Sequence, residues 1–252
     1  MVHLAALPGS PCYDGRLQPI EDAAVADATT LAAAGFDAVI IENFGDSPFF
    51  ADDVPDITIA AVTRMVLAVA REIDLPIGIN ILRNDALGAL AIAAASGATM
   101  IRVNVLSGSM FTDQGLITGR AAAVARERER IAPEVQILAD VFVKHATPPA
   151  GLSLAHAAED LATRGGADAV IVSGHATGSA VDAAALAEVR TAVGETPLLI
   201  GSGAAPATIG TLLELADGVI VGSSLKPAAT AAAPIDLDLA RTFAAAARNA
   251  LG

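Results

Sequence analysis

The chain has 252 residues, of which 54% are hydrophobic and 17% charged, a composition typical of a folded globular protein. Its 15 Lys and Arg against 28 Asp and Glu give a formal net charge of −13, which argues against a nucleic-acid partner because such partners require a basic surface. The single cysteine, Cys12, excludes an internal disulfide framework and a cysteine-rich zinc module.

Eight short apolar segments rich in Val and Ile predict strands that are buried on both faces, as in a parallel sheet. In chain order they are 2–7, 38–43, 77–82, 100–105, 136–143, 169–174, 198–203 and 218–225. Longer segments rich in Ala, Glu and Arg alternate with them and show helical spacing, for example at Val62, Met65 and Val69. The predicted helices are 20–34, 57–73, 85–96, 119–131, 153–164, 182–192, 206–215 and 236–250.

Residues typical of helix ends stand at several of these boundaries. Candidate N-caps precede four helical segments: Asp56 or Thr58, Ser153, Asp182 and Asp236. Pro206 stands where a first-turn proline is tolerated. Glycines suited to a helix C-cap follow three segments: Gly35, Gly97 and Gly166.

Eight strands alternating with eight helices in about 250 residues predict an α/β fold, the (β/α)8 TIM barrel, here as a single domain over residues 1–252. The alternative is an open doubly wound sheet. That fold is disfavoured because the first strand is followed by LPGSP rather than by a G-x-G-x-x-G phosphate loop.

Several strands contain polar residues, which cost free energy in a buried strand unless they are paired. Arg102 and Asn104 share one face by strand parity, as do Asp140 and Lys144, and active sites of this fold lie at the strand C-termini. The candidate catalytic residues are therefore Glu42, Arg102, Asn104, Asp140, Lys144 and His175. Further side chains expected at the mouth are Asn80, Arg83, His145 and Ser173. The alternative is a structural ion-pair network that fills the barrel.

Two Gly/Ser loops follow the last two strands, where this fold usually holds phosphate. Glycine lets backbone N–H groups approach an anion closely, and a helix predicted to start near Pro206 would add its dipole. The predicted phosphate ligands are Gly201, Ser202, Gly203, Gly222, Ser223 and Ser224. The alternative is that these glycines only permit tight turns.

Metal and covalent chemistry remain alternatives to acid/base catalysis. His3, His145 and His175 with two acids could bind a divalent metal, but no H-x-H or H-E-x-x-H spacing supports one, so no cofactor is predicted. Lys144 could form a Schiff base only if burial lowers its pKa, and neighbouring acids oppose that.

Two long segments rich in Gly, Ser and Asp follow strands of the predicted barrel. They cover residues 44–56 and 106–119, and Phe44, Phe49, Phe50 and Phe111 lie in them. We expect them to be loops that act as lids over the mouth, or that are anchored to its rim by these rings.

The chain resembles the BtpA family, also called BtpA/SgcQ, from end to end. The blocks that carry the resemblance are MVHLAALPGSP, IIENFGDSPF, LRNDALGALAIA, IRVNVLSGSMFTDQGLITG, ADVFVKHA, DAVIVSGHATG, LLIGSGAAP and ADGVIVGSSLK. The resemblance implies a TIM barrel related to phosphate-binding barrels. The family is named for a factor in photosystem I accumulation, and similar proteins occur without photosynthesis, which implies an enzyme family whose reaction is not settled.

We therefore expect an enzyme that acts on an anionic small molecule, a phosphorylated sugar or nucleoside-like compound, by isomerase or lyase chemistry. The alternative is a non-catalytic assembly factor of the photosystem I biogenesis type. We expect a cytoplasmic protein because residues 1–11 lack a basic export signal and no apolar run reaches the length of about 20 residues that a membrane span needs. Homo-oligomers are common for such barrels, but the sequence does not indicate which surface would form a subunit interface.

Overall fold

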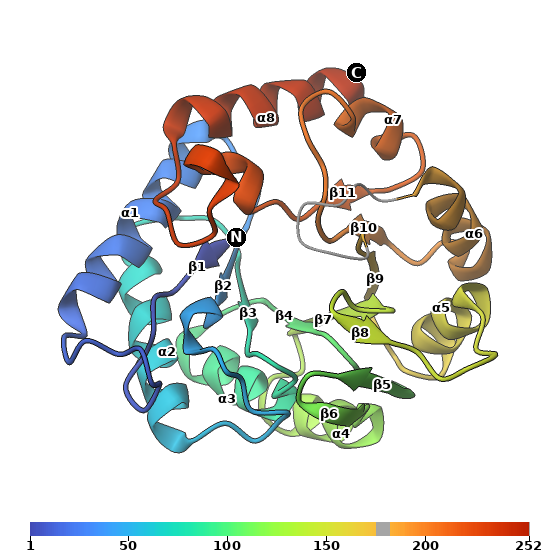
Figure 1. Ribbon diagram of the computed structural model, residues 1–252, viewed down its shortest axis with the longest axis horizontal. Coiled ribbons are helices and arrows are strands. Elements are labelled where there is room, and N and C mark those ends of the chain that lie inside the picture. The colour runs from blue at the N-terminus through green and yellow to red at the C-terminus, as the bar shows by residue number, and fades with distance from the viewer. Residues whose placement is uncertain (175–181, 252) are drawn as a thin grey trace.

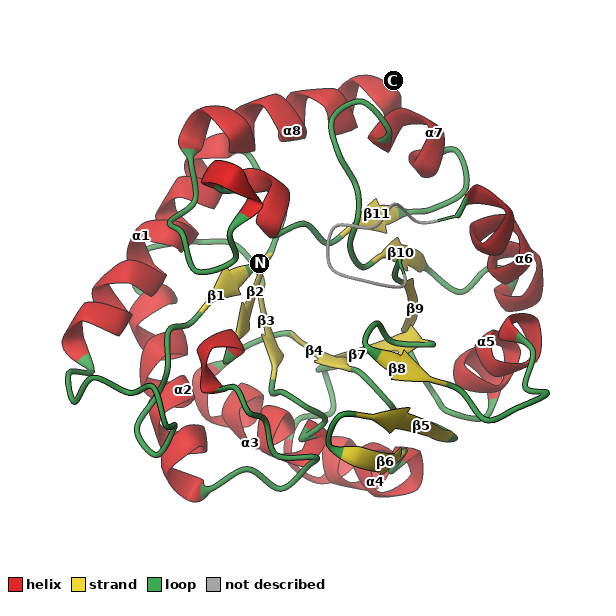
Figure 2. Ribbon diagram, in the orientation of Figure 1, coloured by secondary structure: helices red, strands yellow, loops and turns green. Residues whose placement is uncertain are grey.

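The computed structural model describes residues 1–174 and 182–251. In this part of the chain eight parallel strands lie side by side in the order β1-β2-β3-β4-β7-β9-β10-β11, and eight α-helices surround them (Figure 1). Figure 2 shows the strands as an inner ring and the helices as an outer one. The predicted α/β fold, the TIM barrel, is confirmed.

The bounds of the elements follow the predicted alternation. The barrel strands are β1 (Val2–His3), β2 (Val39–Glu42), β3 (Ile77–Asn80), β4 (Met100–Val103), β7 (Gln136–Val141), β9 (Ala169–Val172), β10 (Leu198–Ile200) and β11 (Gly218–Val219). The helices are α1 (Gln18–Ala34), α2 (Asp56–Val69), α3 (Ala86–Ser96), α4 (Ala121–Ile131), α5 (Leu154–Thr163), α6 (Ala183–Val193), α7 (Ile209–Leu213) and α8 (Leu237–Leu251). The loops contain short 3-10 helices, namely η1 (Phe44–Asp46), η2 (Ser223–Leu225) and η3 (Pro227–Ala229).

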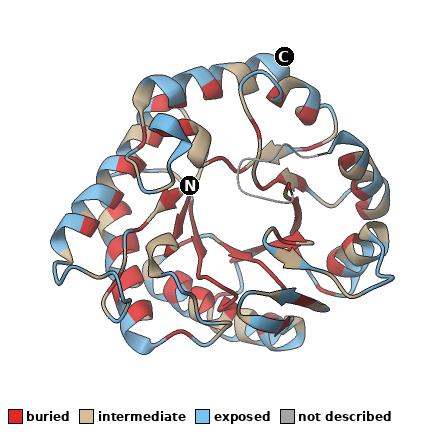
Figure 3. Cartoon of the chain, in the orientation of Figure 1, coloured by how far each residue is buried: buried red, intermediate tan, exposed pale blue. Residues whose placement is uncertain are grey.

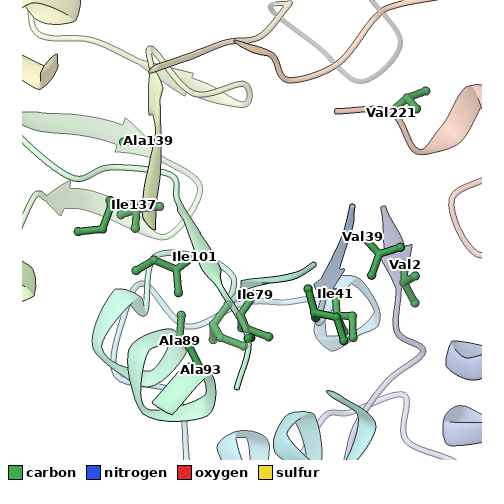
Figure 4. Packing of buried hydrophobic residues seen from close by; sticks show 14 of the residues in the cluster. Val2, Val39, Ile41, Ile79, Ala89, Ala93, Ile101, Ile137, Ala139 and Val221 are labelled. Carbon is green, nitrogen blue, oxygen red and sulfur yellow. The ribbon is translucent and has the colours of Figure 1, made fainter. Parts of the chain in front are cut away.

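Alternate residues of a barrel strand pack into two different apolar cores, one between the strands and the helices and one inside the barrel. Val39 and Ile41 of β2 pack between the strands and the helices, whereas Ile40 packs inside the barrel in a smaller cluster. The outer core is visible in Figure 4, where Ala89 of α3 lies near Ile101 of β4. Figure 3 shows that buried residues follow the strands and the inner faces of the helices. Near-continuous apolar strands are the consequence of burying both faces.

The ring is completed between β1 and the segment that follows β11. The backbone nitrogen of Met1 donates to the carbonyl oxygen of Val221 at 2.8 Å. Leu4 extends the β1 pairing by donating to the Glu42 carbonyl at 2.8 Å. None of the helices in residues 1–174 and 182–251 is long and apolar enough to cross a bilayer.

Some predicted boundaries are wrong. All eight predicted strands extend beyond the observed ones at their C-terminal ends, where the chain leaves the ladder. The helix predicted over 206–215 is only Ile209–Leu213, and Pro206 lies in the turn before it. Pro55 occupies the N-cap position of α2, so neither Asp56 nor Thr58 caps it.

Other predicted helix ends are confirmed. Ser153 caps α5 by accepting from the His156 N–H, and Asp182 caps α6 by accepting from the Ala184 N–H. Gly35 and Gly97 end α1 and α3 in the left-handed conformation, with φ of 84° and 78°. Such a φ is strained for any residue with a Cβ, which is the physical reason for glycine there.

The segment 106–119, predicted as a loop, contains an antiparallel hairpin of β5 (Ser109–Thr112) and β6 (Gly115–Thr118). β8 (Ala146–Thr147) pairs with the other edge of β5. The alternation of buried Met110 and Ile117 with exposed Phe111 and Leu116 is a strand pattern that the Gly and Ser content obscured. A separate apolar cluster forms beneath the hairpin, and Ala51 of the other predicted lid packs against it.

Candidate active site

A cavity of about 200 Å³ opens at the C-terminal ends of the barrel strands. It brings together His3, Glu42, Arg102 and Lys144 with both Gly/Ser loops, 201–203 and 222–224. The predicted phosphate loops and three of the predicted catalytic side chains therefore line one space. They come from β1, β2, β4 and the segments after β7, β10 and β11, which only barrel closure brings close together.

A larger cavity of about 460 Å³ lies beneath the hairpin, between α4 and α5. Its walls are mostly apolar, and of the predicted catalytic residues it touches only Asn104 and Asp140. The smaller cavity is the better candidate because acidic and basic side chains face it together with unpaired backbone donors.

Asp140 is the centre of a buried hydrogen-bond network. Arg102 donates to both of its oxygens at 2.9 Å, from Nε and Nη2. Asn104 Nδ2 donates to Oδ2 at 3.1 Å, and Ser173 Oγ donates to Oδ1 at 3.1 Å. The side chains of Arg102 and Asp140 are 3% and 0% exposed. Burial opposes the charge of Arg102, but Asp140 outweighs it and the pKa of the guanidinium is raised.

These four donors occupy both oxygens of Asp140 and fix the orientation of its carboxyl group. Asn80 supports the network, since its Nδ2 donates to the Arg102 carbonyl at 3.1 Å and to Asn104 Oδ1 at 3.2 Å. Its own Oδ1 is buried and has no hydrogen-bond partner in the described part of the chain. Asp140 and Arg102 thus form a buried ion pair, a feature that the structural alternative predicted.

Glu42 differs from Asp140 although both are buried carboxyl groups. Its carboxyl lines the cavity, and the nearest base is His3 Nε2, at 3.8 Å from Oε1. Burial raises the pKa of Glu42, and the positive charges of Arg102 and Lys144 oppose that shift only in part. A carboxyl with a raised pKa that faces a cavity is suited to donate or accept a proton.

Lys144 lines the same cavity from the segment after β7. Two flanking residues, Phe142 and His145, have φ of 50° and 58°, a left-handed conformation that is strained for residues with a Cβ. Arg83 Nη2 donates to the Lys144 carbonyl at 2.5 Å and fixes the backbone there. Burial lowers the pKa of Lys144, while Glu42 raises it. Burial also lowers the pKa of Arg83.

The two Gly/Ser loops expose hydrogen-bond donors to the cavity. The backbone N–H groups that have no acceptor in the described part of the chain include those of Gly203, Ala204, Ser223 and Ser224. The buried hydroxyl of Ser202 also has no partner among these residues. Because α7 has only five residues and begins at Ile209, the expected helix dipole after Gly203 is not what builds this surface. Unpaired N–H groups in glycine loops are typical of anion sites.

The predicted histidines of the mouth are not among the described residues that line the cavity, apart from His3. His145 lies beside Lys144 but does not line the cavity, and burial and Lys144 lower its pKa. His175 lies outside the described residues. In the described part of the chain no group of three or more His, Cys, Asp or Glu side chains comes together as a metal site. His3 was considered only as a possible metal ligand and not as a catalytic residue, but its side chain lines the cavity.

The absence of a side chain at Gly201 is a steric requirement of this site. A Cβ there would lie 2.4 Å from Ser173 Oγ and 2.5 Å from Ile171 Cγ2. We expect Gly201→Ala to lower the free energy of unfolding by about 1–3 kcal/mol through overpacking.

Urea denaturation measures the effect, and Gly210→Ala is the matched control. Gly210 lies in α7 of the same βα unit, and its added Cβ would meet only Ala250 Cβ, at 3.8 Å. That control should leave stability unchanged or raise it by up to about 1 kcal/mol. Equal stabilities of the two variants would contradict the crowding around Gly201.

Known proteins match this chain over most of its length. The family described as the BtpA family matches residues 1–249. The Photosystem I biogenesis protein BtpA of Synechocystis sp. is 47% identical over 226 residues, which are 90% of this chain and 79% of that protein.

Solved structures with the same architecture have distant sequences. A tryptophan synthase structure from Mycobacterium tuberculosis is 18% identical with a TM-score of 0.65, covering 98% of this chain and 91% of that one. Thiamine phosphate pyrophosphorylase from Pyrococcus furiosus is 15% identical with a TM-score of 0.59, covering 95% and 94%. At such identities the likeness shows the shared barrel fold alone.

Proposed function

This chain belongs to the BtpA family, and from that premise we propose that it is an enzyme that binds a small phosphorylated sugar or nucleoside-like compound and moves a proton on it, as isomerases and lyases do. One observation carries the proposal. The same cavity holds the unpaired backbone donors of two Gly/Ser loops and the side chains of Glu42, Arg102 and Lys144.

The anionic end of the substrate binds to the loops 201–203 and 222–224. Backbone N–H groups and the Ser202 hydroxyl donate to its oxygens, which satisfies donors that otherwise cost free energy in a buried site. These hydrogen bonds act only at short range within the cavity. A chain with a net charge of −13 can therefore still bind an anion there. A cavity of about 200 Å³ is smaller than most ligand pockets, which favours a substrate of few atoms.

Proton transfer falls to Glu42, whose carboxyl faces the cavity and whose pKa burial raises. Lys144 faces the same space and neutralises an oxyanion that forms on the substrate. Asp140 acts through Arg102, because it accepts two hydrogen bonds that hold the guanidinium at the cavity wall. Asn104 acts through Asp140, to which its Nδ2 donates. His175 remains a candidate second proton carrier.

Titration with ribose 5-phosphate and related esters by calorimetry tests the proposal. We expect measurable binding to the unmodified chain and at least a tenfold loss of affinity in Ser223→Glu, because the new carboxylate would repel the phosphate.

Thr99→Glu is the control, since Thr99 is exposed and precedes β4, at the opposite pole of the barrel. It adds the same charge and should bind as the unmodified chain does. Failure of every phosphorylated compound to bind the folded protein would sink the proposal.

The name of the Synechocystis relative supports a second candidate, a non-catalytic factor for assembly of a membrane pigment–protein complex. That role requires an exposed apolar contact surface. Affinity capture from membranes of a photosynthetic organism distinguishes the candidates. Recovery of photosystem subunits by a chain carrying Glu42→Gln and Lys144→Met would favour assembly, since that role needs neither side chain.

A further inference from the structure

Contacts with three neighbouring residues, Phe44, Gly222 and Ala231, position the His3 ring. The ring of Phe44 packs on it with centroids 4.8 Å apart. Gly222 lies against its edge, where a Cβ would come within 2.9 Å of His3 Cε1. The side chain is only 9% exposed, and its ring lines the candidate active-site cavity. The imidazole is therefore positioned between Glu42 and the loop 222–224.

The hydrogen bond of Nδ1 determines which nitrogen of His3 carries the proton. Nδ1 lies 3.3 Å from the carbonyl oxygen of Ala231, and a carbonyl can only accept. Nδ1 is therefore protonated, and in the neutral ring Nε2 has a free lone pair. Nε2 lies 3.8 Å from Glu42 Oε1, about 0.6 Å beyond the usual limit of a hydrogen bond, so proton transfer between them requires the two side chains to approach by that amount.

The charges around this pair disfavour its ionisation when the cavity holds no anion. Burial lowers the pKa of His3 to about 3, and the Met1 amino group, Lys226 and Lys144 act in the same direction. Burial raises the pKa of Glu42, opposed by Arg102, Lys144 and the Met1 amino group and assisted by Asp140. A protonated Glu42 beside a neutral His3 is the arrangement that places no charge on this buried pair.

We propose that His3 and Glu42 share one proton, and that an anion bound at the loop 222–224 draws this proton from Glu42 Oε1 to His3 Nε2. The proposal rests on the proposed function, because it takes the anion site from it. The step breaks one O–H bond and forms one N–H bond, and the neutral pair becomes an imidazolium and a carboxylate.

Bound phosphate favours the transfer because its negative charge lies beside Gly222, against which the His3 ring packs. Glu42 is thereby left as a carboxylate in the cavity only when the substrate is present. A base that forms on binding stays neutral in the empty site, where a buried charge would be costly. His3 is then a positioning residue that holds the proton while Glu42 contacts the substrate.

Nitrogen-15 NMR of the histidine side chains tests this with inorganic phosphate as the probe. The chain has four histidines, so His3→Gln assigns the His3 signals by their loss, and His156→Gln serves as the control. Without phosphate at pH 7.5 we expect the neutral Nδ1–H form. With saturating phosphate we expect the imidazolium pattern, which requires the pKa of His3 to rise from about 3 to above 7.5. In Glu42→Gln the ring should stay neutral under the same conditions.

Calorimetry in two buffers of different ionisation enthalpy complements the spectra, because internal transfer takes up no proton from solvent. Phosphate that binds with unchanged His3 signals would overturn the inference and leave the proposed anion site intact. A protein to which phosphate does not bind at all would overturn both. An Nε2–H tautomer in the phosphate-free chain would overturn the shared proton, whatever the variants do.

Discussion

Replacing Asp140 by alanine should lower the free energy of unfolding by about 3–5 kcal/mol, because it leaves the buried guanidinium of Arg102 without its partner. Both oxygens of Asp140 accept from Arg102 at 2.9 Å, and the two side chains are 3% and 0% exposed. Asn104 and Ser173 also lose the acceptor of their hydrogen bonds. An uncompensated charge costs more than the net value of the pair, since water cannot reach it.

Urea denaturation at pH 7 measures this effect. Glu127→Ala is the control, because Glu127 pairs with Arg130 on the surface and its loss should hardly move the midpoint. The double variant Asp140→Leu with Arg102→Met should recover much of the loss, since no charge remains to be buried. A single variant Asp140→Ala that loses less than about 1 kcal/mol would mean that Arg102 has another partner, and the network as described would be wrong.

The second large effect is a change in the pH dependence of stability in Glu42→Gln. Burial raises the pKa of Glu42 in the folded chain above its ordinary value of 4.5, so the folded state holds this proton where the unfolded state has released it. Stability therefore falls as pH rises above 4.5, and it continues to fall until the folded pKa is reached. Glutamine carries no such proton, so the variant gains on the unmodified chain by up to about 1.4 kcal/mol per pH unit in that window.

The difference between the two unfolding free energies, measured from pH 4 to pH 9, isolates this contribution. Other groups, such as the Met1 amino group, appear in both curves and largely cancel. Glu134→Gln is the matched control, because it makes the same substitution at an exposed glutamate. A flat curve for Glu42→Gln would show that the carboxyl is ionised in the folded chain. The inference that Glu42 and His3 share one proton would then be wrong.

The strand and helix alternation could be predicted because both faces of each barrel strand are buried. Ile40 packs inside the barrel and Ile41 packs beneath the helices, so both positions are apolar. Together they form part of a continuous apolar segment in the sequence. Strand ends could not be predicted in the same way. Asn104, for example, continues the sequence pattern of β4, yet it leaves the ladder and its side chain binds Asp140 on the neighbouring strand β7.

The hairpin β5–β6 shows a different limit. Its Gly and Ser content favours a loop, and its strand alternation spans only four residues on each side. Cross-strand pairing and the apolar cluster beneath it outweigh the weak local preference. Non-local contacts of this kind leave almost no trace in a single sequence.

The sequence by itself determined the barrel, the pole at which its polar residues gather, and the two glycine loops beside them, because strand parity and turn chemistry are local properties. Only the tertiary structure decided what each polar group can do. Asp140 and Glu42 look equivalent along the chain, yet four donors hold one while the other faces a cavity with His3 at 3.8 Å. The difference lies in partners that residues far apart in sequence supply, and the cost of burying a charge depends on those partners alone.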